Sequence, residues 1–219
     1  MKPIKCIQHW LIIVFLVVQT YSLSASDDNE SDANKSNLPL PNLIRNPGFE
    51  IHEGGFQLSA WITQQHAGER AYVINYDDGV ATIDKQGEQH WFTLTQLLDP
   101  KALLGKSLCF EAEVKLDLSI DGPDNLLKIG GGLSVQIKGH GELSRTDLLI
   151  GRGNRVLFSS ILKNEPILGQ HDWVNTNIAF TVPEEAKQMI IGFTHQADGK
   201  MQIRQPRLVE SAECPTIRD

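Results

Sequence analysis

Residues 42–50 read Asn42-Leu43-Ile44-Arg45-Asn46-Pro47-Gly48-Phe49-Glu50, and Trp61 follows a short way along the chain. The Pro-Gly pair predicts the centre of a β-turn, because proline presets φ and glycine tolerates a positive φ. Two apolar residues precede the turn and an aromatic residue follows it, so a strand is expected to turn into an anchored segment. The pattern indicates the start of a domain.

Beyond this opening, short apolar stretches alternate with turn residues. Clusters of glycine, aspartate, asparagine and proline separate them, as at residues 77–79, 121–124 and 198–199. Short strands at such spacing are typical of a β-sandwich or barrel. Single helical turns are expected at 99–104 and 184–186. The strands are predicted at residues 71–76, 80–83, 89–96, 107–116, 131–138, 155–161, 174–182, 188–194 and 200–209.

Three stretches occur in an order and spacing that is found in one known fold. The first is the Asn-x-x-x-Asn-x-x-Phe-Glu run at 42–50 ahead of a tryptophan; the second leads from 89–96 to Phe110, and the third from Asp172-Trp173 to Leu208. Together they resemble the galactose-binding-like domains, the fold of many carbohydrate-binding modules. The resemblance spans residues 42–210 and implies an all-β, jelly-roll β-sandwich. It does not imply one activity, because this fold hosts many binding roles and some enzymes.

The first 26 residues are expected to be a signal peptide. Lys2 and Lys5 precede an unbroken apolar run at 10–18, and small residues follow at 22–26. The run is about half of the ~20 residues that a bilayer span needs, although an uncleaved anchor is the alternative. We therefore expect an exported protein, periplasmic or extracellular, with no membrane insertion after the signal is removed.

The segment at 27–41 is polar and lacks aromatic residues, so it is expected to be a disordered tether. The β-sandwich domain is then expected over 42–210, with a C-terminal tail at 211–219. Removal of the signal takes away two lysines and no acid, which changes the formal net charge from −7 to −9. A chain this acidic has no electrostatic reason to bind nucleic acid or an anionic membrane.

Export would place Cys109 and Cys214 in an oxidising compartment, whereas Cys6 lies within the signal. Alternation along residues 107–116 puts the apolar side chains on one face, so Cys109 points outward. An outward cysteine on a strand and a cysteine in a C-terminal tail suggest a disulfide that fastens the tail. The alternative is two free thiols and a loose tail.

Trp91 is the best candidate for a sugar contact, because its neighbours Phe92 and Leu94 occupy the core face of their strand. Carbohydrate recognition needs a flat aromatic ring against the apolar face of a pyranose, and polar groups that bond its hydroxyls. Packing under a loop is the alternative role for Trp91. If their strands lie beside that of Trp91, the expected hydroxyl partners are Gln136, Glu113 and Lys115.

Four other aromatic residues have packing as the favoured role. Tyr72 and Tyr76 are candidate sugar contacts, but Ile74 lies on the same face of their strand, which favours the core. Trp61 and Trp173 fall at positions that are usually core in the resembling family. Both are therefore expected to pack.

The resembling family often holds a structural calcium between the acid of the opening motif and an aspartate in the last strand. Glu50 matches the first position, but Arg204 and Gln205 stand where relatives often carry aspartate. A hard cation needs carboxylate and carbonyl oxygens, and Arg204 would repel it. We predict no metal and no cofactor, with Glu50 and the Gln205 carboxamide as a weak alternative site. The histidines show no metal-ligand spacing.

Catalysis would have to come from Glu111 and Glu113, which lie two residues apart on one face, about 6.6–6.8 Å along the strand. Glycosidases place two carboxyls about 5–9.5 Å apart across a cleft, which an open strand face beside Lys115 does not provide. The sequence therefore favours an exported, non-catalytic module that binds a glycan or polysaccharide. The alternatives are a protein-interaction or scaffold domain that meets an envelope protein, and a small glycan-active enzyme.

Overall fold

A computed structural model describes residues 40–51, 60–120, 129–139, 155–160, 167–211 and 213–214. All of them belong to one compact unit, Pro39–Asp219. The predicted signal peptide, and the tether up to residue 39, lie outside the described residues. Within the described ranges, no helix is long and apolar enough to cross a membrane.

The described residues form ten strands and one short 3-10 helix, η2 (Lys101–Leu103), so the all-β prediction is confirmed. Nine strands overlap the nine predicted ranges, and β1 was not predicted. Its four residues are mostly exposed and lack an alternating pattern. The strand expected at Leu43 and Ile44, before the Pro-Gly turn, does not form. The strands are β1 (Ile62–Gln65), β2 (Tyr72–Asp77), β3 (Val80–Lys85), β4 (Phe92–Leu98), β5 (Ser107–Ser119), β6 (Gly130–Gly139), β7 (Arg155–Ser159), β8 (Gly169–Thr181), β9 (Ala186–Gln196) and β10 (Asp198–Glu210).

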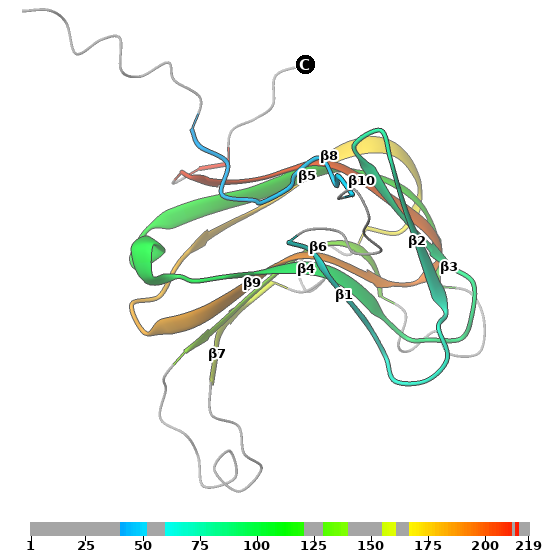
Figure 1. The fold of residues 1–219 in the computed structure, drawn as a ribbon, viewed down its shortest axis with the longest axis horizontal. Coiled ribbons are helices and arrows are strands. Elements are labelled where there is room, and N and C mark those ends of the chain that lie inside the picture. Colours follow the sequence, from blue (N-terminus) through cyan, green and yellow to red (C-terminus); the bar gives the residue numbers. More distant parts are fainter. Residues whose placement is uncertain are drawn as a thin grey trace, which may run out of the picture. The chain divides into compact units, whose positions relative to one another are not determined.

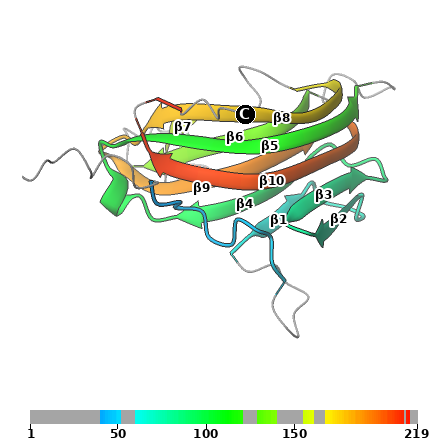
Figure 2. The same cartoon turned by 90° about the horizontal axis from the view of Figure 1, so that it is seen from above.

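Two five-stranded antiparallel sheets face each other as a jelly-roll β-sandwich (Figures 1 and 2). The first sheet has the order β1-β4-β9-β6-β7, and the second has the order β2-β3-β10-β5-β8. Strands that follow each other in the chain often lie in different sheets, as β4 and β5 do. The sandwich is therefore held together by pairings between distant parts of the sequence.

The core fills the space between the inner faces of the sheets. Leu94, Val135 and Phe193 from the first sheet are fully buried, as are Phe110 and Ile203 from the second. Strand alternation produces this arrangement, since every second side chain points inward. The predicted inward faces of the strands at 89–96, 107–116 and 131–138 are confirmed by this burial.

The opening stretch connects the two ends of the domain. Asn42 donates from Nδ2 to the Pro206 carbonyl at 3.0 Å, and its Oδ1 accepts from the Leu208 amide at 3.0 Å. Trp61 is buried, as expected, and its Nε1 donates to the Asn46 carbonyl at 2.9 Å. The opening motif thus has a structural role, because the side-chain amide of Asn42 fastens it to β10.

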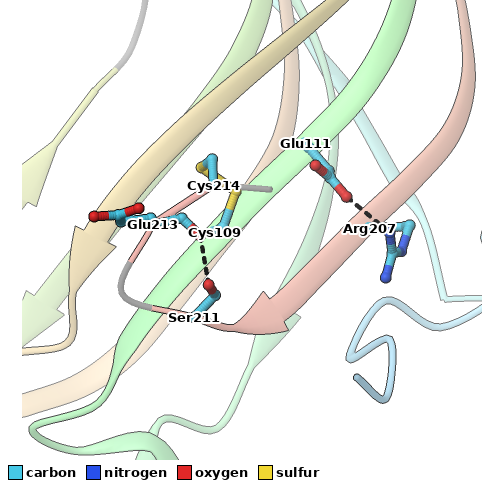
Figure 3. Close-up of a disulfide and its surroundings, with 6 residues drawn as sticks. All are labelled: Cys109, Glu111, Arg207, Ser211, Glu213 and Cys214. Carbon is cyan, nitrogen blue, oxygen red and sulfur yellow. Dashed lines mark hydrogen bonds and ion pairs between the residues drawn. A yellow bond between two sulfur atoms is a disulfide. The ribbon is translucent and has the colours of Figure 1, made fainter. Parts of the chain in front are cut away.

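The C-terminal tail is fastened to the outer face of the second sheet. Cys109 and Cys214 form a disulfide that closes a span of 105 residues (Figure 3). Ser211 also donates its hydroxyl to the Glu213 carbonyl in the same turn. Cys109 points away from the core, as predicted, yet it is fully buried because the tail lies over it.

Candidate functional site

The structure separates the polar residues that the sequence grouped around Trp91. Trp91 directly precedes β4, and Gln136 lies on β6, so both belong to the first sheet. Glu113 and Lys115 lie on β5 in the second sheet. They point away from the core on the opposite side of the sandwich, so the proposed grouping of Glu113 and Lys115 with Trp91 is wrong. Gln136 is also apart from Trp91, because it pairs with Ile190 of β9, which pairs with Leu97 near the other end of β4.

Trp91 lies on the outer side of the first sheet at one end of β4. Its strand neighbour Phe92 is buried in the core, so alternation directs Trp91 and Thr93 outward. Trp91 is half-buried rather than enclosed. Its backbone carbonyl accepts a hydrogen bond from the His66 amide at 3.3 Å. This bond closes the end of the β1–β4 pair and brings the His66 ring next to the indole.

Around Trp91 the structure gathers rings and an amide, which we call the Trp91 corner: Trp91, His66, His90 and Gln89. The His66 ring meets the Trp91 ring edge-on, with centroids 6.4 Å apart, and meets the His90 ring at 5.4 Å. His66 Nδ1 lies 3.2 Å from the Gln89 Oε1. An aromatic surface with hydrogen-bonding groups at its margin is the chemistry that a sugar ring needs.

Small side chains form rows across the outer face beside the Trp91 corner. In one row, Gln64, Thr93, Thr194 and Gly132 are consecutive register partners on β1, β4, β9 and β6. Thr194 is only 2% exposed, so the middle of this face is not open in the structure. The accessible groups lie at the margin, where Gln64 is exposed and Trp91 and Thr93 are half-buried.

Gly192 on β9 allows the strands of this sheet to approach closely. Its φ is 152°, and a Cβ atom at this position would lie 2.1 Å from the Leu94 carbonyl oxygen. Only glycine fits a backbone contact of this kind. The glycine therefore fixes β4 against β9, which positions the strand that leads from Trp91.

The two candidate tyrosines lie on the inner face of β2. Tyr72 is 2% exposed, and its hydroxyl donates to the Gln89 and His195 carbonyls at 3.3 and 3.4 Å. Burial raises its pKa, with a smaller contribution from the Asp198 charge. Tyr76 stacks on Phe49 with centroids 6.3 Å apart. Tyr72 supports the Trp91 corner from behind, through Gln89, but its ring is not available to a ligand.

The outer face of the second sheet carries paired charges. Arg204 on β10 bonds Glu113 on β5. Arg207 on β10 donates to Glu111 on β5 at 3.0 Å (Figure 3). Lys115 pairs with Asp172 at 2.9 Å. A β-bulge lets both arginines point outward, since the register of β10 against β5 shifts between Arg204 and Arg207.

Trp173 lies on this charged face and not in the core, which corrects the expected core position. The Arg204 guanidinium carbon sits 4.2 Å from the centroid of its ring. The register of β5 against β8 also shifts beside it, between Val114 and Leu116. Regular alternation from the inward Val174 directs Trp173 outward, where Arg204 covers it.

The two carboxyls that the catalytic alternative needs are not placed around a substrate bond. The Glu111 side chain is 1% exposed and faces Arg207, while Glu113 is paired with Arg204. Burial raises the pKa of Glu111, and the nearby Arg207 charge opposes this effect. A carboxyl enclosed in this way cannot reach a glycosidic oxygen, so the geometry gives the pair a structural role.

The weak metal alternative falls near the meeting point of the opening motif and β10. Gln205, in a bulge with φ of 52°, lines a surface depression together with Pro47, Gly48, Arg204 and Arg207. The two guanidinium groups disfavour a cation there. Among the described residues, no group of three or more His, Cys, Asp or Glu side chains could hold a metal ion.

Sequence reasoning missed His66 and His90. His66 follows β1, which carried no periodic signal, and its contact with Trp91 depends on the pairing of β1 with β4. His90 directly precedes Trp91, so proximity in the chain was available as a signal. No local pattern could have brought His66 to the same place.

No protein-family model matches the sequence, and no curated protein matches it. Solved structures do resemble it. The enzymatically active domain of tailspike protein 4 from bacteriophage CBA120 has a TM-score of 0.50 at 13% identity, and the match covers 78% of this chain. The chain spans 21% of the length of that tailspike chain.

Two carbohydrate-binding modules also resemble the chain. A family 4 module has a TM-score of 0.47 at 15% identity, covering 77% of this chain and 99% of the module. A family 22 module from Clostridium thermocellum has a TM-score of 0.43 at 12% identity, covering 78% and 99%. Identities this low concern the fold alone. The fold that these structures share with the chain is an antiparallel jelly-roll β-sandwich of two sheets.

Proposed function

We propose that this protein is an exported, non-catalytic module that binds a glycan at the Trp91 corner. The observation that carries the proposal is the half-buried indole of Trp91 outside the core, bordered edge-on by His66 and beside the Gln89 amide. An indole supplies the flat apolar surface for a pyranose, and the imidazole and amide supply hydrogen bonds that select among hydroxyls.

The charge of the chain favours a neutral glycan. The acidic residues outnumber the basic ones, so a polyanionic polysaccharide would be repelled at low ionic strength. The rows beside the Trp91 corner also present amide and hydroxyl groups, such as those of Gln64 and Thr93, and no charged side chain. The Cys109–Cys214 disulfide supports export, because such bonds persist in oxidising compartments.

The test is a titration of the purified protein with a panel of neutral and acidic polysaccharides and oligosaccharides. Tryptophan fluorescence detects binding near an indole, and affinity electrophoresis in gels containing the polysaccharide gives a readout that does not depend on Trp91. Trp91→Ala is expected to abolish retardation by the ligand. Trp173→Ala is the matched control, since it removes a half-buried indole from the other sheet and should bind normally.

Two results would contradict the proposal. Binding that persists in a folded Trp91→Ala variant would place the glycan elsewhere, and absence of binding across the whole panel would remove the glycan function. The second result would favour the envelope-protein alternative. Ile62 and Leu97, exposed on the same outer face, would then be the first positions to alter in a pull-down.

A further inference from the structure

Strand β8 is a long, open edge of the second sheet. It has 13 residues and, among the described residues, pairs only with β5. The other three sheet edges are short, with four residues in β1, six in β2 and five in β7. Proteins usually shorten or protect an edge strand, because its unpaired amides and carbonyls can accept another strand. The length of β8 therefore sets it apart.

Most of β8 also lacks the charged residues and prolines that usually keep an edge strand from pairing with another strand. Residues 173–181 read Trp-Val-Asn-Thr-Asn-Ile-Ala-Phe-Thr, with no charged residue and no proline. Val174 is 37% exposed although its register partner Val114 is fully buried. A β-branched side chain that points to the inner face and remains exposed lacks a neighbour on its open side. Among the described residues, no side chain covers Val174 on this open side of the strand.

We propose that two copies of this chain pair antiparallel through β8, about a two-fold axis at Thr176. In this register Val174 lies opposite Ile178 of the second copy, and Asn175 lies opposite Asn177 of the second copy. The pairs match by face, because inward residues meet inward residues and outward residues meet outward ones. The two second sheets then form one continuous sheet, an isologous arrangement in which each pair occurs twice.

A second copy fits this edge better than a strand of another protein. The same residue, Thr176, meets itself at the axis, and Val174 gains the apolar neighbour that it lacks. The charged end of the strand does not oppose itself, because Asp172 lies four residues from the axis, at the shift in register between β5 and β8 that ends the regular stretch. Pairing through the second sheet also leaves the outer face of the first sheet free. The inference therefore does not depend on the glycan proposal.

The first experiment measures molar mass by sedimentation equilibrium over a concentration series. The natural chain should approach twice the monomer mass. Asn175→Lys with Asn177→Lys places lysines opposite each other in both central pairs, and should weaken dimerisation by about tenfold. Asn175→Lys with Asn177→Glu is the matched control, because each lysine then faces a glutamate of the second copy. It should dimerise at least as well as the natural chain.

A second experiment tests the register. Thr176→Cys should form an intermolecular disulfide under mild oxidation, because a residue on the axis faces its own copy. Asn175→Cys should not, since its two copies would be diagonal neighbours about 7–8 Å apart. A monomer mass at all concentrations up to about 1 mM would overturn the proposal. So would a dimer that both charge variants leave unchanged, or equal cross-linking of the two cysteine variants.

Discussion

The two outer faces of the sandwich each carry a half-buried tryptophan, but in opposite surroundings. Trp91 lies at one end of the first sheet, and the nearest row across the outer face of that sheet consists of Gln64, Thr93, Thr194 and Gly132, with no charged side chain. Trp173 on the second sheet lies beneath Arg204, among arginine–glutamate pairs. Trp91 has a near-perpendicular imidazole ring beside it, and Trp173 has a cation over its face.

The difference shows that exposure alone does not identify a binding residue. A sugar must contact the face of the indole, and on Trp173 the Arg204 guanidinium already occupies a face at 4.2 Å. The arginine is held there by Glu113, so a ligand would have to break both contacts. The ring contact described for Trp91 is a near-perpendicular one with the His66 imidazole, at 6.4 Å between centroids, and no cation is described over its indole. The comparison therefore favours the first sheet as the ligand face and the second as the interaction edge.

The largest expected effect concerns the disulfide that covers part of the second face. Cys109→Ala with Cys214→Ala should lower the free energy of unfolding by about 2–5 kcal/mol, because the bond constrains a span of 105 residues in the unfolded chain. Denaturant unfolding of the variant, with the reduced natural protein alongside, measures this loss. A change below about 1 kcal/mol would mean that the tail adds little to the sandwich.

The next effect concerns His195, which lies on the inner face of the first sheet behind the Trp91 corner. It is fully buried, its Nε2 bonds the Gly199 carbonyl at 3.1 Å, and its Nδ1 has no hydrogen-bond partner among the described residues. Burial lowers its pKa from 6.5 to about 4, with Lys85 adding to the shift, and the Gly199 hydrogen bond, Asp198 and Asp84 opposing it.

The sign of the pH dependence follows from these values. Below pH 6.5 the unfolded chain binds a proton at His195, and the folded protein does not until about pH 4. The free energy of unfolding should therefore fall by up to about 3 kcal/mol as the pH drops through this window. His195→Gln, which keeps a donor for the Gly199 carbonyl, should remove this part of the slope. An unchanged slope in the variant would show that other groups cause the acid sensitivity.

The fold could be predicted from the sequence because its signals are local. Alternating residues such as Leu108, Phe110 and Ala112 place a strand and its core face without reference to any partner. The site could be predicted only in part, since it depends on which strands become neighbours. Glu113 and Trp91 both point outward, yet β5 and β4 lie in different sheets. Local alternation contains no information on that separation.

An irregularity in strand pairing accounts for the arginine–glutamate pairs, which the sequence did not predict. Strict alternation would place Arg204 and Pro206 on one face of β10, with Arg207 on the other. The bulge at Gln205, with its positive φ, shifts the alternation of side chains by one residue. Arg207 therefore lies on the outer face with Arg204, and Pro206 is buried. A proline within a strand, such as Pro206, indicates a bulge or an edge strand, because it cannot donate a hydrogen bond to the sheet. It did not indicate that two arginines would meet two glutamates there.

The smallest expected effect separates the two tryptophans directly. Arg204→Ala should uncover Trp173 and lower the free energy of unfolding by about 1 kcal/mol, through loss of the ring contact and of a partly exposed ion pair. In a Trp91→Phe background, acrylamide quenching of the remaining fluorescence should rise when Arg204 is replaced. Arg204→Lys should give an intermediate result, because lysine keeps the charge without the planar group. Equal quenching with arginine, lysine and alanine at position 204 would mean that Arg204 does not cover the Trp173 ring. Trp173 would then become as strong a ligand candidate as Trp91.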